Sequence, residues 1–244
     1  QITTSGAGNI TFIGSTYGNG VTSYGININN DSTITAGSGT ITLNGSSTGA
    51  ATNNYGVIIE NTVTAATIET TGNGNINITG TKSAGGGRDF FLNGSVMSTV
   101  RSQGTGTITI NADSVNIGST YATIQTNGAI ALKPRTAGAT YGISGGTCGS
   151  SCNINLIDAG LARLFPDNDG NGIGSLIIGD KDAGTGLVDI NGWDLLGKTY
   201  DVEVYGGTVD LTGGPITWNG GNDLTLHSRT GDLVIDQNFT RNAG

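Results

Sequence analysis

The sequence predicts an all-β protein folded as a parallel β-helix, a solenoid of about eight to eleven coils with one loop excursion and one short helical turn. Short segments that alternate apolar and polar residues return at nearly constant intervals. The first apolar residues of the early copies, Ile10, Ile41, Ile76 and Ile108, lie 31, 35 and 32 residues apart. Successive segments are joined by corners too brief for conventional crossovers. Thr and Asn recur at matching positions, as stacked ladders require. A β-sandwich of short strands is the alternative.

The alternation also predicts which side chains face the interior, because successive residues of a strand point to opposite faces. The expected inward pairs in residues 1–133 are Ile10 and Phe12, Ile26 and Ile28, Ile41 and Leu43, Val57 and Ile59, Ile76 and Ile78, Phe90 and Leu92, Ile108 and Ile110, Val115 and Ile117, and Ile130 and Leu132. Beyond Leu176 they are Leu176 and Ile178, Val188 and Ile190, Val202 and Val204, Val209 and Leu211, Ile216 and Trp218, Leu224 and Leu226, and Leu233 and Ile235.

We divide the chain into regular repeats at 1–133, a loop excursion at 134–160 and an acidic continuation of the solenoid at 161–244. Residues 134–152 interrupt the regular spacing of the repeats, and a strand is expected to resume at 153–157.

One helical turn is expected directly after that strand. Asp158 is placed to cap it, Leu161, Leu164 and Phe165 share one face, and Pro166 ends it.

The charge is low and unevenly placed. Charged residues make up 11% of the chain and the net charge is -8. Residues 1–150 carry five acids and five bases, so the thirteen acids and five bases of 151–244 supply the whole excess. Without a basic stripe, nucleic acid is not an expected partner. No segment has the length and hydropathy of a membrane span or a signal peptide. The chain starts at Gln1 without Met, which favours a processed chain or a segment of a longer one.

The repeats resemble those of filamentous-haemagglutinin-type exoproteins. The resemblance rests on Gly-Thr-Ile-Thr-Leu-Asn-Gly at 39–45, Leu-Ala-Arg-Leu-Phe at 161–165, Ser-Leu-Ile-Ile-Gly at 175–179, Gly-Thr-Gly-Leu-Val-Asp-Ile at 184–190, Asn-Asp-Leu-Thr-Leu at 222–226 and Gly-Asp-Leu-Val-Ile at 231–235. It implies a right-handed parallel β-helix from a large bacterial adhesin, secreted or bound to the cell surface. The Asn-Pro-Asn motifs of that family's secretion domain are absent, so the resemblance implies a downstream shaft.

A candidate calcium site lies at Asp167, Asp169 and Asn171, where oxygen side chains alternate before Gly172. This spacing matches the first half of a calcium loop, but Ile178 stands where the bidentate Glu belongs. A polar turn explains the same residues.

A second acidic group, Asp189, Asp201, Glu203 and Asp210, alternates with inward residues and is expected to face outward. Like charges on adjacent rungs would repel unless a cation lay between them, so a solvated acidic face is the simpler account. These acids also keep a polysaccharide-degrading enzyme or a glycan-binding module open as an alternative function. The aromatic residues available for stacking on sugars are Trp193, Tyr200, Tyr205 and Trp218.

Cys148 and Cys152 are expected to form a disulfide, which implies an oxidising, extracytoplasmic setting. His227, the single histidine, is expected to face solvent. No catalytic residue is assigned.

The function expected from the sequence is therefore structural and adhesive: the shaft of a bacterial surface adhesin, or a subunit of an extracellular fibre. Its expected partners are other copies of itself, further repeats of a longer chain, and host or cell-surface glycans.

Overall fold

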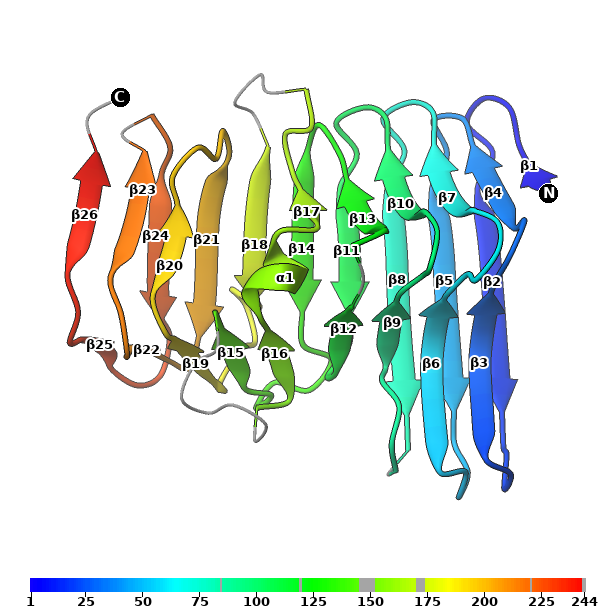
Figure 1. The fold of residues 1–244 in the computed structure, drawn as a ribbon, viewed down its shortest axis with the longest axis horizontal. Helices are drawn as coiled ribbons and strands as arrows, with labels where there is room; N and C mark the ends of the chain where they lie inside the picture. Colours follow the sequence, from blue (N-terminus) through cyan, green and yellow to red (C-terminus); the bar gives the residue numbers. More distant parts are fainter. Residues whose placement is uncertain (84, 119, 145–151, 170–173, 220, 243–244) are drawn as a thin grey trace.

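The computed structural model describes residues 1–83, 85–118, 120–144, 152–169, 174–219 and 221–242, and these form a parallel β-helix as the repeats predict. Successive coils stack along the long axis from the N-terminus to the C-terminus (Figure 1). The longest sheet contributes one strand to each of eight coils, within the range expected from the repeat length.

Five parallel sheets form the walls of the solenoid, and within each sheet the strands follow one another along the axis. The eight-stranded sheet holds β2 (Ile10–Thr16), β5 (Ile41–Ser47), β8 (Ile76–Lys82), β11 (Ile108–Asn111), β14 (Ala129–Lys133), β18 (Ser175–Gly179), β21 (Asp201–Gly206) and β24 (Leu224–Ser228). The six-stranded sheet holds β1 (Ile2–Thr3), β4 (Thr33–Ala36), β7 (Ala66–Thr70), β10 (Ser98–Ser102), β13 (Ala122–Gln125) and β17 (Leu164–Phe165). The four-stranded sheet holds β12 (Val115–Ile117), β9 (Phe90–Leu92), β6 (Asn53–Ile59) and β3 (Thr22–Ile28). The five-stranded sheet holds β16 (Ile154–Leu156), β15 (Tyr141–Ile143), β19 (Leu187–Ile190), β22 (Thr208–Leu211) and β25 (Leu233–Ile235). The three-stranded sheet holds β20 (Trp193–Leu195), β23 (Ile216–Asn219) and β26 (Phe239–Asn242).

The core is a set of aliphatic columns that run through the coils. Ile10, Ile41, Ile76, Ile108 and Ile130 are register partners in successive strands, and all five are buried. The predicted inward residues are buried in the core or pack against it, with two exceptions: Leu233 and Ile235 are 43% and 50% exposed. These two lie on the final strand of their sheet, so no further rung covers them.

Asparagine side chains at the corners hydrogen-bond to the following coil at several places in the N-terminal half. Asn9 Oδ1 accepts a hydrogen bond from the Thr40 backbone N–H at 2.8 Å, and Asn75 Oδ1 accepts one from the Thr107 N–H at the same distance. Asn30 Oδ1 accepts a hydrogen bond from the Thr62 backbone N–H. Because corner N–H groups fall outside the strand ladders, these side chains satisfy donors that need partners.

The 134–160 excursion contains two strands of the solenoid. Residues 141–143 were expected to be loop, but they form β15, and the strand expected at 153–157 is β16. β16 follows β15 in sequence, yet it lies between β12 and β15 and packs beside β12. The excursion therefore inserts an extra rung on one wall, which explains the interrupted spacing.

The helical turn is present as α1 (Asp158–Leu161), but its expected cap is wrong. Ile157 is the N-cap residue and makes no side-chain cap hydrogen bond. Asp158 Oδ1 instead accepts a hydrogen bond from Ser144 Oγ at 2.5 Å. The expected helical face shared by Leu161, Leu164 and Phe165 is also wrong, because Leu164 is buried in β17 while Phe165 is 36% exposed.

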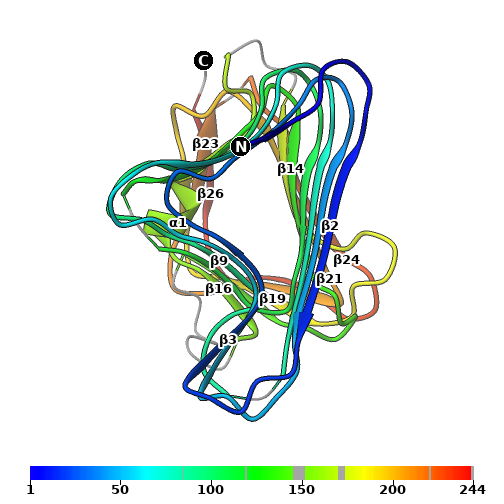
Figure 2. The same ribbon diagram turned by 90° about the vertical axis from the view of Figure 1, so that its right-hand side faces the viewer.

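The first three coils carry a flattened extension, which we call the fin: residues 14–25, 45–56, 80–83 and 85–89. There the eight-stranded and four-stranded sheets touch backbone to backbone, and Figure 2 shows the fin projecting beyond the main cross-section. A Cβ added at Gly45 would lie 2.1 Å from the Gly56 carbonyl oxygen, and one at Gly14 would lie 2.1 Å from the Gly25 oxygen. Only glycine allows this approach.

We expect Gly45→Ala to destabilise the fold, because the new Cβ forces the two fin strands apart. Overpacking of this kind costs about 1–3 kcal/mol. Urea unfolding should show the loss as a lower midpoint than that of the unaltered chain. Gly20→Ala is the matched control, since a Cβ there meets no atom within 4 Å. Equal midpoints for the two variants would contradict the backbone contact in the fin.

Candidate functional site

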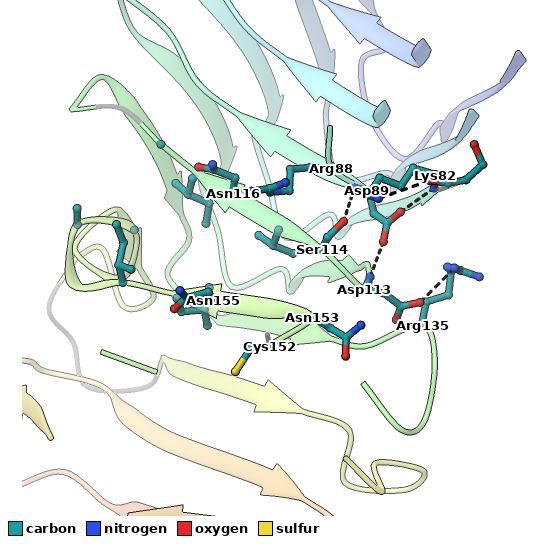
Figure 3. Close-up of a pocket in the computed structure, with 18 residues that line it drawn as sticks. Lys82, Arg88, Asp89, Asp113, Ser114, Asn116, Arg135, Cys152, Asn153 and Asn155 are labelled. Carbon is teal, nitrogen blue, oxygen red and sulfur yellow. Dashed lines mark hydrogen bonds and ion pairs between the residues drawn. The ribbon is translucent and has the colours of Figure 1, made fainter. Parts of the chain in front are cut away.

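A surface groove lies where the fin ends (Figure 3). Seven residues, 83–89, connect β8 to β9 in the last fin coil, whereas only 112–114 connect β11 to β12 in the next. This sudden shortening leaves a step in the wall. The groove beside the step has a volume of about 820 Å³ and is bounded on its other side by β16 and α1.

The two carboxylates of the groove are engaged in holding the step together. Asp89 is 3% exposed, and its Oδ1 and Oδ2 accept hydrogen bonds from the backbone N–H groups of Lys82 at 2.6 Å and Asp113 at 2.9 Å. Burial raises the pKa of Asp89, and these two backbone bonds oppose that rise. Asp113 accepts hydrogen bonds from Arg135 and from both the N–H and hydroxyl of Thr136. Both acids therefore serve the connection between coils.

Three basic side chains line the groove, and they differ in how many hydrogen bonds they already make within the protein. Arg135 pairs with Asp113 at 3.1 Å, and Lys82 Nζ donates to the carbonyl oxygens of Ser83 and Gly85. The exposed Arg88 donates one hydrogen bond, from Nη1 to the adjacent Gly87 oxygen, at 2.7 Å. The guanidinium has five N–H donors, so most of its capacity is directed at solvent in the groove.

Two asparagine side chains complete the lining. Asn116 on β12 and Asn155 on β16 both border the groove, and neither makes a side-chain hydrogen bond to another described residue. Each primary amide offers two donors and one acceptor oxygen. The groove thus presents one guanidinium and two amides with unused hydrogen-bonding capacity.

An aromatic row leads along the outer wall to the groove. Tyr24 and Tyr55 are register partners whose ring centroids lie 5.7 Å apart, and the Tyr55 ring lies 5.6 Å from that of Phe91. All three rings are half-buried. Phe91 is in turn the register partner of Asn116. The row was missed in the sequence, although the repeat of Tyr-Gly at 24–25 and 55–56 marks it.

The aromatic residues expected to stack on sugars are placed differently. Trp193 and Tyr200 are 7% and 6% exposed and belong to the core. Trp218 packs edge-on against Phe239, and Tyr205 packs against the exposed His227. The solvent exposure expected for His227 is confirmed.

The candidate calcium residues do not come together as a described site. Asp167 is buried at 4% exposure, Asp169 is exposed, and Asn171 lies outside the described residues. The described residues contain no group of three or more His, Cys, Asp or Glu arranged to hold a metal. Calcium binding at this turn stays a prediction.

The predicted disulfide involves a residue on the rim of the groove. Cys152 borders the groove and is not a free thiol. Cys148 lies outside the described residues, so its bond to Cys152 stays a prediction.

The expectation of a solvated acidic face is wrong for Asp189, which is 2% exposed. Its Oδ1 accepts a hydrogen bond from Thr212 Oγ1 at 2.7 Å, and its register partner on the next rung is Asp210. Burial, followed by the charges of Asp189 and Asp236, raises the pKa of Asp210. Two carboxylates are therefore stacked on one wall.

Comparisons with protein-family models, with curated proteins and with solved structures found no match for this chain. The search for membrane-spanning helices, made over the described residues, also found none that is long and apolar enough.

Asp210→Asn should stabilise the chain at neutral pH by removing repulsion from Asp189. Like charges on paired rungs cost about 0.2–1 kcal/mol. The raised pKa means that the folded state holds the Asp210 proton more tightly than the unfolded state does. That contribution to stability is present below the ordinary aspartate pKa and is lost as pH rises through the raised value.

Urea unfolding at pH 7 and at about pH 3 checks this sign, because the advantage of Asp210→Asn should vanish at the lower pH, where the raised pKa leaves the Asp210 carboxyl protonated and uncharged. Asp31→Asn, which removes an exposed acid in the first half, is the charge-matched control. A variant that is less stable than the unaltered chain at pH 7 would show that Asp189 and Asp210 do not repel.

Proposed function

We propose that this chain is a rod-like structural segment of an extracellular bacterial protein, either the shaft of a surface adhesin or a subunit of a fibre. The observation that carries the proposal is the eight-stranded parallel sheet, which runs through every coil with its aliphatic columns in register. Parallel sheets with a buried inner face hold their register strongly, since a one-residue slip would expose the apolar side chains.

The end coils support a role in assembly. β24, β25 and β26 are each the last strand of their sheets, and β1, β2 and β3 end theirs at the opposite side. Apolar side chains are exposed at the later end, including Leu233, Ile235 and Phe239. Unpaired strand edges with apolar neighbours recruit further strands. The partner for these edges is another set of coils, from a longer chain or from a second copy.

The bacterial and extracellular parts of the proposal rest on the sequence. They are supported by the resemblance to filamentous-haemagglutinin-type repeats and by the predicted disulfide, which requires an oxidising compartment. A polysaccharide-degrading enzyme is less well supported in the described groove. Glycosidic cleavage uses a pair of carboxylates as acid and as base or nucleophile, whereas Asp89 and Asp113 already accept backbone hydrogen bonds.

Electron microscopy of the concentrated protein should show filaments or end-to-end joined rods, and Ile235→Lys should reduce them to single rods. A charge at an open strand edge opposes pairing there at little cost to the fold, because Ile235 is half exposed. Light scattering across a concentration series gives the assembly mass. Leu196→Lys, at a 40% exposed position away from the last coil, is the control. Joined rods that persist in Ile235→Lys would rule out this edge as the contact.

A further inference from the structure

The groove differs in charge from the rest of the chain. Lys82, Arg88 and Arg135 line it together with two acids, Asp89 and Asp113, which gives a local balance of +1. The whole chain carries -8. Three of the five bases in residues 1–150 therefore gather at one step in the wall. Local positive charge in a concave site attracts an anionic ligand.

The groove and the aromatic row form one continuous track along the axis. The Gly56 N–H donates to the Arg88 carbonyl at 3.1 Å, so Arg88 lies on the rung next to Tyr55. Phe91 and Asn116 are paired in register, and β16 with Asn155 packs beside β12. From β3 to β16 the track crosses four rung spacings, about 19 Å. It fits an extended ligand with repeated units better than a compact one.

We propose that this track binds a linear acidic oligosaccharide. Arg88 pairs with the carboxylate of one sugar unit, since a guanidinium matches a carboxylate in two parallel hydrogen bonds. Asn116 and Asn155 bond to ring hydroxyls, which need both donors and acceptors. The half-exposed rings of Tyr55 and Phe91 contact the apolar faces of neighbouring sugars. This binding is independent of the proposed rod assembly, because every contact lies on the side wall.

Isothermal titration calorimetry with two acidic probes, oligogalacturonate and oligomannuronate, tests the proposal on the whole chain. Saturable binding to at least one is expected, and the methyl ester of that oligomer should bind at least about tenfold more weakly, because it lacks the charge that Arg88 pairs with. Absence of saturable binding to both acidic oligomers would overturn the proposal. Equal affinity for acid and ester would also overturn it.

Arg88→Ala should weaken binding of the acidic oligomer about tenfold or more and leave binding of its ester unchanged. Asn116→Asp should weaken acid binding as well, since it places a carboxylate in the track. Arg229→Ala, which removes an exposed arginine in the other half, and Tyr17→Ala, at a 78% exposed tyrosine that belongs neither to the groove lining nor to the aromatic row, are the controls. Affinity that falls equally in Arg88→Ala and Arg229→Ala would show only general charge attraction.

Tyr55→Leu separates stacking from charge. It keeps an apolar side chain in the row, and it should weaken binding of acid and ester alike. Thermal unfolding of each variant confirms that the solenoid is intact, and Arg88 is exposed enough that its loss should leave the melting temperature unchanged. Full affinity in Tyr55→Leu would remove the aromatic row from the site and overturn the extended track.

Discussion

In-register stacking is the constraint on which the rest of the structure depends. Each side chain in a strand lies about 4.8 Å from its partners on the coils before and after it. Where the partners are aliphatic, as in the column that begins at Ile10 and Ile41, stacking removes apolar surface from water at every step. Where they are charged, the same geometry forces repulsion, as it does for Asp189 and Asp210. Whether a side chain stabilises the fold therefore depends on its stacking partners in the coils before and after it.

This constraint explains how much of the fold could be predicted from the sequence. The Ile10, Ile41, Ile76 and Ile108 spacing reveals the rungs directly, because a solenoid repeats its chemistry wherever it repeats its geometry. Alternation within each rung then gives the inward face. Prediction failed where one copy differs from its neighbours. Residues 141–143 form a rung without a matching motif, and β16 enters the wall out of sequence order.

The groove could not be predicted for a related reason. It is produced by a difference in length between two consecutive coils, since 83–89 is longer than 112–114. No single residue encodes that step. Its acids, Asp89 and Asp113, belong to no sequence motif, and in the structure both accept hydrogen bonds from backbone N–H groups. The uncommitted groups, Arg88 and Asn116, carry no motif at all. They are identified only when their neighbours are known.

Asp189 shows why burial could not be inferred from alternation alone. Alternation along the strand correctly places the Asp189 side chain on the opposite face from Val188 and Ile190. A side chain on the outer face can nevertheless be buried from solvent. Thr212 and the next rung cover this carboxylate and leave it 2% exposed. A solenoid tolerates the local destabilisation from such a buried carboxylate because each coil contacts only its neighbours. For the same reason a groove can be built into one side wall while the ladders continue unchanged on the others. Strength along the axis and recognition at the side are then separate properties of one chain.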